Sequence, residues 1–410
     1  MNILIISTSD MQGGAAIASF RLMNALIRRG EKVKMLVRDK RSDHPEVITT
    51  GNSLLHKLNF YQERAIIFLH NRLSRKNLFD ISIANSGVSI TEHPLFRQAD
   101  VIHLHWINQG MLSLGEIACI IASGKKVVWT MHDMWPFTGI CHHAAGCTLY
   151  EKGCGDCPYL AAPSPSDLSR QLFQKKIKAY GQGRITFVAC SHWLKELAVK
   201  SPLTAGHKVI AIPNPIDTER YYPMDKRDLR RKRHLPESSK IILFASVKAS
   251  DPRKGIDYLV EASRIIAQQQ RDILFLIAGS NGEEMSKRLS LPARSLGYVA
   301  PEEMPEIYNS ADLFVTPSLQ ENLPNTIMEA MACGTPCIGF DTGGIPEMIA
   351  HGKNGYVAKY RDAEDLASGI LRTLYAKEPE TLSAYARHSV QSEYNQDKVA
   401  NQYMEIYAKG

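Results

Sequence analysis

Continuous apolar runs alternate along this chain with segments whose apolar residues recur at three- and four-residue spacing. A run at residues 3–6 is followed by such a segment at 18–26, and a second run occupies 33–37. The runs are typical of strands buried on both faces of a parallel sheet, and the spacing indicates a helix. The start of the chain therefore predicts a strand–helix–strand unit with Gly13 and Gly14 at the helix entrance. A tight turn alone would also explain these two glycines.

The next segments continue this alternation. Residues 100–105, 126–130 and 186–189 predict further buried strands, and His132 and Asp133 come shortly after the second of them. Polar residues in that position lie at the carboxyl edge of a parallel sheet, where ligands bind in open α/β folds. His132 is therefore a candidate site residue.

The second half of the chain repeats the layout of the first. Residues 240–244 and 273–278 predict strands on either side of a helix at 256–266. Later strands and closing helices are predicted at 312–316, 336–340, 363–378 and 392–408. Two doubly wound α/β halves with parallel sheets predict a deep interdomain cleft, lined by loops at the carboxyl edges of both sheets.

The segment 209–223 contains three prolines and no helical periodicity, so we interpret it as a linker. It separates an N-terminal Rossmann-like domain at 1–208 from a C-terminal Rossmann-like domain at 224–390. The last residues, 391–410, are expected to form a helix that packs back on the N-terminal domain.

Composition narrows the class of protein. A length of 410 residues allows two or three domains, and 44% hydrophobic residues are enough for large cores. The net charge of +7 is too mild to indicate a nucleic-acid partner, so none is expected, but it fits an anionic ligand or an anionic lipid surface. Eight cysteines, no apolar run of about 18 residues and no basic leader together predict a cytoplasmic protein.

Residues 54–73 predict a long amphipathic helix in which leucines and isoleucines mix with Lys57, Arg64 and Arg72. One interpretation is a helix packed on the core with a solvated basic face. The other is a contact with a membrane surface or a lipid-linked acceptor.

The segment 317–346 predicts a strand end, a polar loop, a helix and another strand. Glu321 lies in the loop and Glu329 inside the helix, with seven residues between them. A helix N-terminus is a natural anion site, and carboxylates held near it are candidates for ligand contacts. A capping Glu321 and a solvated Glu329 would be the alternative.

A cationic pair opens the first helix of the second half. Lys254 stands beside Gly255, with Arg253 before it and Lys248 further back. A cation next to exposed helix N–H groups favours a diphosphate, although a solvated basic loop would look the same. The sequence has neither a Walker loop nor a G-x-G-x-x-G after its first strand, which disfavours P-loop chemistry and a dehydrogenase.

A cysteine-rich loop occupies residues 141–157. Its cysteines, separated by five, six and two residues, are Cys141, Cys147, Cys154 and Cys157. In a reducing compartment this cluster predicts a structural zinc site that would leave no open position for catalysis. Four ordinary thiols are the alternative.

Taken together, the motifs are similar to those of the family-4 type of retaining, nucleotide-sugar-dependent glycosyltransferases, which have the GT-B fold. The resemblance runs nearly from end to end. It rests on QGGAAIASFRLMNAL, DVIHLHW, TMHDMW, IPNPID, RKGIDYL, LGYVAPEEMPEIYNSADLFVTPS and the paired glutamates of segment 317–346. HDMWPFTG beside the cysteine-rich loop resembles a bacterial surface-polysaccharide subgroup.

The resemblance implies roles for individual residues. Catalytic roles fall on His132, Glu321 and Lys254. Donor binding falls on Gly14, Arg253, Lys254, Gly297, Tyr298, Val299, Glu321, Asn325, Thr326 and Glu329. Lys254 would bind the diphosphate, Glu321 the transferred sugar and Glu329 the ribose. The family commonly has an arginine where this chain has Ala249, so Lys248 or Arg253 would have to substitute for it.

The implied reaction is transfer of a hexosyl group from a nucleoside-diphosphate sugar to a hydroxyl of a glycan or lipid-linked acceptor, with retained configuration and no required catalytic metal. The implied setting is synthesis of a surface polysaccharide such as capsule or lipopolysaccharide, in the cytoplasm or peripherally at the inner face of the plasma membrane. Two alternatives remain open: a GT-B-fold nucleotide-sugar epimerase, and a noncatalytic, zinc-stapled protein that binds a sugar or nucleotide.

Overall fold

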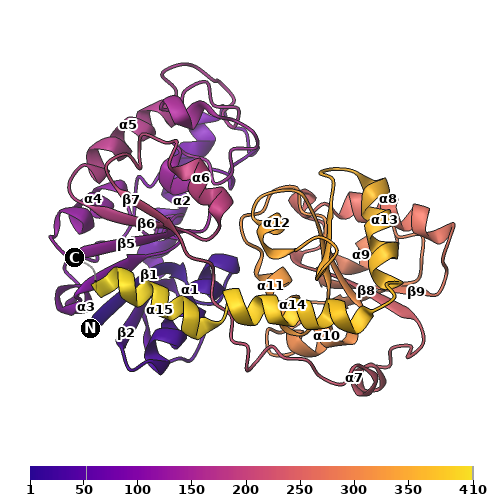
Figure 1. Ribbon diagram of the computed structural model, residues 1–410. Coiled ribbons are helices and arrows are strands. Elements are labelled where there is room, and N and C mark those ends of the chain that lie inside the picture. The colour runs from indigo at the N-terminus through magenta and orange to yellow at the C-terminus, as the bar shows by residue number, and fades with distance from the viewer. Residues whose placement is uncertain (52, 409–410) are drawn as a thin grey trace. The chain divides into compact units, whose positions relative to one another are not determined.

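The computed structural model describes residues 1–51 and 53–408, and the chain divides into two compact units (Figure 1). Unit 1 comprises Met1–Pro213 together with the chain from Val399 onward, and unit 2 comprises Asn214–Lys398. Each unit contains one parallel β-sheet with helices on both of its faces. The expected α/β class with two doubly wound parallel sheets is confirmed.

Within the described part of unit 1, seven parallel strands follow the order β3-β2-β1-β4-β5-β6-β7. Their bounds are β1 (Asn2–Ser9), β2 (Lys32–Asp39), β3 (Val47–Thr49), β4 (Val101–Leu104), β5 (Lys126–Met131), β6 (Ile185–Ala189) and β7 (Lys208–Ala211). The strand order reverses between β1 and β4, which is where an open parallel sheet binds ligands. Strand β7 extends into the segment interpreted as the linker.

The helices of unit 1 cover both faces of this sheet. They are α1 (Gly14–Arg28), α2 (Ser53–His70), α3 (Pro94–Gln98), α4 (Leu114–Ala122), α5 (Leu168–Tyr180), α6 (His192–Ala198) and α15 (Gln396–Ala408). Ile3 and Ile5 join a core with α1 and α15, whereas Leu4 and Ile6 join the core on the opposite face with α4 and α5. A strand that is buried on both faces explains why its apolar run is unbroken.

Among the described residues of unit 2, six parallel strands follow the order β10-β9-β8-β11-β12-β13. The strands are β8 (Lys240–Lys248), β9 (Ile273–Ser280), β10 (Ala293–Gly297), β11 (Leu313–Thr316), β12 (Cys337–Phe340) and β13 (Gly355–Ala358). The helices are α7 (Lys226–Lys232), α8 (Ile256–Ala267), α9 (Gly282–Ser286), α10 (Met304–Ser310), α11 (Asn325–Ala332), α12 (Ile345–Met348), α13 (Ala363–Leu374) and α14 (Pro379–Glu393).

The structure of helix α2 contradicts one of the two interpretations of its sequence. The prediction that its leucines pack on the core while its basic face is solvated is wrong, because Leu54, Leu58 and Leu69 are exposed. The side that faces the protein carries Glu63 and Arg64, both buried. In the part of the chain that the structure describes, no helix combines the length and apolar character needed to cross a membrane.

The buried Glu63 of α2 holds the following loop in place. One oxygen of its carboxylate accepts hydrogen bonds from the backbone N–H groups of Ile83 and Ala84, at 2.7 and 3.0 Å. The other lies 2.8 Å from Arg64 as an ion pair, without the alignment of a hydrogen bond. This carboxylate therefore balances a buried cation and satisfies buried backbone donors at once.

We predict that Glu63→Ala lowers the free energy of unfolding of unit 1 by about 3 kcal/mol, because it strands a buried guanidinium and two backbone donors. All four tryptophans lie in unit 1, so their fluorescence in a urea titration reports this unit. Glu63→Gln keeps an acceptor and should cost less. Equal stability of Glu63→Ala and the wild type would contradict the assignment.

Candidate functional site

Three loops of unit 2 meet at the carboxyl ends of neighbouring strands β8, β11 and β12. The backbone N–H of Leu319 donates to the carbonyl of Arg253 at 2.7 Å, which ties the loop after β11 to the loop after β8. The N–H of Gly344 donates to the carbonyl of Asn322 at 2.7 Å, which ties in the loop after β12. The three loops thus form one hydrogen-bonded surface at the edge where ligands bind in parallel sheets.

Lys254 and Glu321 meet on this surface. The Nζ of Lys254 lies 2.5 Å from Oε2 of Glu321, although 67 positions separate the two residues in the chain. Both side chains are partly exposed, so the pair is accessible to a ligand. The structure therefore brings together the cation expected for the diphosphate and the carboxylate expected for the sugar.

Two glycines make this meeting of the loops possible. Gly255, at the N-terminus of α8, has a φ of +69°, and a Cβ there would lie 1.8 Å from the carbonyl oxygen of Pro317. Gly343, with a φ of +60°, would place a Cβ 1.7 Å from the carbonyl oxygen of Glu321. Only a residue without a side chain fits either position, and this requirement fixes the backbone on both sides of the Lys254–Glu321 pair.

The basic residues around Lys254 are arranged less simply. The guanidinium of Arg253 is held by Asp251, with Nη2 and Nε at 2.8 and 3.2 Å from its two carboxylate oxygens. Ala249, where the family commonly has an arginine, is completely buried in the core of unit 2. Lys248 ends the exposed tip of β8. Arg253 could substitute for the arginine that the family commonly has at position 249 only with a charge that Asp251 already neutralises in large part.

Glu329 points into unit 2 from α11. It is only 7% exposed, and its Oε2 accepts a hydrogen bond from the hydroxyl of Tyr308 at 2.8 Å. Burial, together with the negative charge of Glu329, raises the pKa of Tyr308 well above its usual value, so its hydroxyl stays a donor. The alternative of a solvated Glu329 is therefore wrong. The sequence did not predict a role for Tyr308, because no pattern in it indicates that a residue of α10 contacts Glu329.

The remaining donor-side residues lie at two further places in unit 2. Asn325 and Thr326 begin α11, where the Oδ1 of Asn325 accepts a hydrogen bond from the side chain of Asn214 at 3.1 Å. Gly297 ends β10 with a φ of +63°, followed by an exposed Tyr298 and a half-buried Val299.

In unit 1, Gly14 begins α1 and His132 follows β5, so each is close to the carboxyl end of a strand. The Nε2 of His132 lies 2.9 Å from Nδ1 of His105, and its Nδ1 lies 3.5 Å from the Sγ of Cys190. The His105 ring packs on His103, with ring centroids 4.2 Å apart. His132 therefore sits at the end of a buried imidazole stack.

The C-terminal helix α15 anchors this stack. The hydroxyl of Tyr407 lies 2.6 Å from Nδ1 of His103, and Nε2 of His103 lies 2.8 Å from Oγ1 of Thr130. The Oγ1 of Thr130 lies in turn 2.9 Å from the hydroxyl of Tyr403. Burial lowers the pKa of His132 to about 4, against the opposing charge of Asp133, and lowers that of His103 to about 3. The imidazoles are therefore neutral at pH 7.

Asp133 connects the end of β5 with the cysteine-rich loop. Its Oδ2 lies 2.7 Å from Nδ1 of His142 and accepts a hydrogen bond from the Trp106 indole at 2.8 Å. Burial alone would raise the pKa of Asp133, but the charge and hydrogen bond of His142 outweigh it and lower the pKa to about 2. His142 of the cysteine-rich loop is therefore bonded to Asp133, the residue directly after His132.

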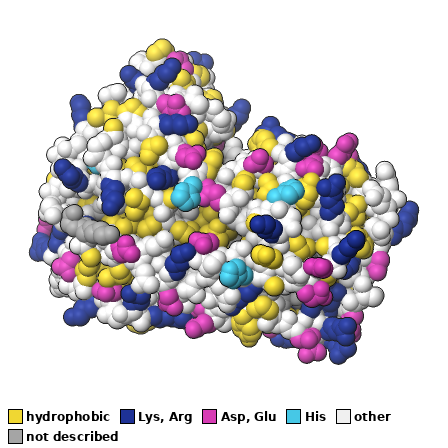
Figure 2. Space-filling view, in the orientation of Figure 1, with side chains coloured by type: hydrophobic (Ala, Val, Ile, Leu, Met, Phe, Trp, Pro, Cys, Tyr) yellow, Lys and Arg dark blue, Asp and Glu magenta, His cyan; other side chains and the backbone are white. Residues whose placement is uncertain are grey.

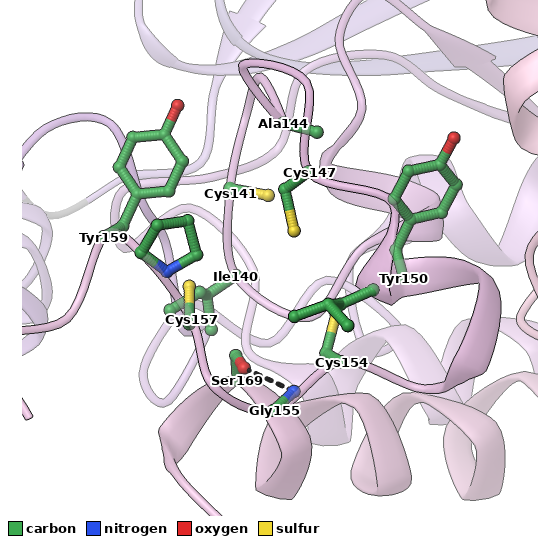
Figure 3. Close-up of a pocket in the computed structure, with 12 residues that line it drawn as sticks. Ile140, Cys141, Ala144, Cys147, Tyr150, Cys154, Gly155, Cys157, Tyr159 and Ser169 are labelled. Carbon is green, nitrogen blue, oxygen red and sulfur yellow. Dashed lines mark hydrogen bonds between the residues drawn. The ribbon is translucent and has the colours of Figure 1, made fainter. Parts of the chain in front are cut away.

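The four loop cysteines line one small pocket (Figure 3). All of them are free thiols. Burial raises the pKa of Cys141 to about 12 and that of Cys154 and Cys157 to about 11, so these thiols are protonated at pH 7 when no metal is bound. Among the described residues, no group of three or more His, Cys, Asp or Glu side chains could hold a metal ion. The structure does not support the predicted zinc site, and the alternative of ordinary buried thiols fits it.

The comparison with known families agrees with the fold. Residues 12–220 match Glycosyltransferase Family 4, and residues 225–389 match the Glycosyl transferases group 1 family. The chain is a glycosyltransferase with the GT-B fold. It belongs to glycosyltransferase family 4, a retaining family that uses nucleotide-sugar donors.

Two curated relatives illustrate the range of the match. The chain is 25% identical to an Escherichia coli UDP-Gal:alpha-D-GlcNAc-diphosphoundecaprenol alpha-1,3-galactosyltransferase, over 81% of each protein. It is 30% identical to the Bacillus anthracis N-acetyl-alpha-D-glucosaminyl L-malate synthase, over 47% of this chain and 52% of that protein. The second match thus spans about half of the relative's length.

Solved structures share the fold at lower identity. A sucrose-phosphate synthase from Thermosynechococcus elongatus aligns with a TM-score of 0.67 at 20% identity, over 99% of this chain and 98% of that one. WaaG, a glycosyltransferase involved in lipopolysaccharide biosynthesis, aligns with a TM-score of 0.63 at 15% identity over the full length of both chains. At this identity the likeness shows the fold alone.

We predict that Gly255→Ala destabilises unit 2 by about 3 kcal/mol or more, because a positive φ and a close approach to Pro317 both oppose a side chain. Gly352→Ala is the matched control, with a φ of +77° but no atom within 4 Å of its Cβ; it should cost about 1–2 kcal/mol. Hydrogen exchange in α8 and β8 measures the difference. Equal costs for the two variants would show that the loops can separate freely.

The buried imidazoles predict a pH dependence. Their pKa values in the folded state lie below the usual 6.5, so the unfolded chain binds more protons between about pH 4 and 6.5. The free energy of unfolding of unit 1 should therefore fall as pH drops through this window, by about 1.4 kcal/mol per pH unit for each such histidine. Tryptophan fluorescence follows it. His103→Gln should flatten the slope, whereas His70→Gln, at an exposed position, should not.

Proposed function

We propose that the protein transfers a hexosyl group from a nucleoside-diphosphate sugar to a hydroxyl of a glycan or lipid-linked acceptor, in the synthesis of a bacterial surface polysaccharide. The observation that carries this proposal is the accessible pair of Lys254 and Glu321, held 2.5 Å apart where three loops meet. Two relatives support it by their names. That of the E. coli galactosyltransferase above includes a diphosphoundecaprenol-linked sugar. The other is the amylovoran biosynthesis glycosyltransferase AmsK of Erwinia amylovora, 30% identical over 49% of this chain and 53% of that protein.

In this proposal Lys254 exchanges partners when the donor binds. The diphosphate competes with Glu321 for the ammonium group, because both are anions within reach of the same Nζ. Glu321 is then released toward hydroxyls of the transferred sugar. Lys254 and the backbone N–H groups at the start of α11, at Asn325 and Thr326, stabilise the charge that develops on the leaving diphosphate.

The nucleoside is assigned to the inner end of the same surface. Glu329 is held by Tyr308 and would accept hydrogen bonds from ribose hydroxyls, a role that carboxylates have in dinucleotide folds. Gly297, Tyr298 and Val299 would frame the base, because the exposed Tyr298 ring offers a stacking surface at the end of β10.

From unit 1 we assign His132 to the sugar and the reacting bond, and Gly14 to the phosphates. His132 is held as a neutral imidazole, so it would act by hydrogen bonding and not as a cation. No carboxylate is assigned as a covalent nucleophile. The step is written as substitution on one face of the sugar: the bond from the anomeric carbon to the diphosphate oxygen breaks, the acceptor oxygen bonds to the same carbon, and its proton passes to the departing diphosphate oxygen.

A panel of nucleotide sugars with and without an acceptor tests the reaction class. Transfer to a lipid-linked acceptor supports the proposal. Release of an epimerised sugar without an acceptor would favour the epimerase alternative, and binding without turnover would favour a noncatalytic protein.

We predict that Lys254→Ala weakens the binding of the preferred nucleoside diphosphate by at least about tenfold, because a charge-assisted contact to phosphate is lost. Isothermal titration calorimetry measures it. Glu321→Gln should instead lower kcat with a small change in that affinity. Lys353→Ala, at an exposed lysine of the same unit, is the control. Unchanged affinity in Lys254→Ala would refute the diphosphate assignment.

A further inference from the structure

Helix α2 presents its apolar side to solvent. Residues 54, 58, 61, 65 and 69 are spaced by three or four positions and share one face, whereas 56, 59, 63 and 67 share the opposite face. The second group is buried, and it includes His56, Asn59 and Glu63. The buried face is thus mainly polar, with Ile67 as its apolar exception, and the exposed face mainly apolar, which inverts the usual arrangement.

The inverted orientation is held by specific contacts of the buried face. Besides the bonds of Glu63 described above, Arg64 donates to the carbonyl of Ile81 at 3.1 Å. The Oγ1 of Thr50 lies 2.9 Å from Nε2 of His56, and the backbone carbonyl of Asn59 accepts a hydrogen bond from Ser86 at 2.9 Å. Rotating the helix to bury its leucines would break all of these contacts, so the exposure of the leucines is built into the fold.

The exposed apolar residues form what we call the outer face of α2. It consists of Leu54, Leu58, Tyr61 and Leu69 of the helix, with Leu73 and Phe79 of the following turn. Each of these six side chains is between 60% and 73% exposed. Exposed apolar residues usually occur singly, so a row of them along a helix about 27 Å long indicates a surface that is covered in use.

The charges of this segment restrict what covers it. Lys57, Arg72, Arg75 and Lys76 are exposed, and Glu63 is the single carboxylate in the sequence from 53 to 79. Because Glu63 is buried, the exposed charges of residues 53–79 are all cations, and the next carboxylate, Asp80, is half-buried. By contrast, acidic and basic side chains are interspersed on the face of the molecule in Figure 2.

We propose that the outer face of α2 docks on an anionic lipid bilayer, with its leucines and aromatic rings in the interfacial region and its cations on lipid phosphates. Apolar side chains beside a carboxylate-free set of lysines and arginines match the requirements of interfacial helices. A second copy of this chain fits less well, since a symmetric contact would bring each set of cations against its copy. Membrane docking does not depend on the proposed donor chemistry, but its use in reaching a lipid-linked acceptor rests on the proposed function.

Flotation of the full chain with lipid vesicles tests the proposal. The wild type should float with vesicles that mix phosphatidylcholine and phosphatidylglycerol, and much less with phosphatidylcholine alone. Leu58→Ser combined with Leu69→Ser should lower the partition coefficient at least about tenfold, since two side chains lose their burial in the interface. Lys57→Gln combined with Arg75→Gln should lower it on the anionic vesicles only, and added salt should have the same effect.

Matched variants give the comparison its controls. Val199→Ser with Tyr385→Ser removes exposed apolar side chains elsewhere, and Lys353→Gln with Lys377→Gln removes exposed cations; both should float as the wild type does. Tryptophan fluorescence confirms that unit 1 is folded, and nucleoside diphosphate titration reports the donor site separately.

Either of two results would overturn the proposal. One is flotation that Leu58→Ser with Leu69→Ser leaves unchanged. The other is a wild-type dimer, seen by light scattering, that this variant converts to a monomer, because the outer face would then be an interface between copies. Loss of vesicle binding with normal donor turnover on a soluble acceptor would support docking independently of the catalytic assignment.

Discussion

The close approach of the loops after β8 and β11 is the constraint on which the candidate site of unit 2 depends. Gly255 allows the backbone at Pro317 to come within a distance that excludes any Cβ, and Gly343 does the same beside Glu321. These contacts place Lys254 against Glu321 although 67 positions separate them. This contact on a partly exposed surface compensates the charge of each group. Under the proposed function, a diphosphate and a sugar would replace it when the donor binds.

In unit 1 a similar principle works with neutral groups. His132 ends a stack of imidazoles that continues through His105 to His103 and is tied to Tyr407 of α15. Burial keeps these rings uncharged, and a neutral ring with fixed partners has a defined orientation but no net charge. The last helix of the chain thus determines how a residue after β5 is held. A truncation that removed α15 would take away the support of His132 without touching it.

The cysteine-rich loop and α2 pack against each other. Ile67 of α2 packs in a small core with Cys141 and Cys157. These two thiols are surrounded by apolar side chains and pack there as small hydrophobic residues. That small core holds α2 from beneath while Glu63 fixes its rotation. The loop therefore supports the outer face of α2 through packing and through hydrogen bonds, such as that from the N–H of His142 to the carbonyl of Asp80 at 3.0 Å.

The sequence by itself determined the two doubly wound sheets, because buried parallel strands require unbroken apolar runs and their helices a regular spacing. It also singled out Lys254, Glu321 and Glu329 as candidate donor-side groups, since they stand at recognisable positions around strands and helices. Only the tertiary structure decided which groups touch. Tyr308 donates a hydrogen bond to Glu329, Arg253 pairs with Asp251, and the leucines of α2 are exposed to solvent. Such contacts join residues far apart in the chain, and a helical period states which side chains share a face but not which face is buried.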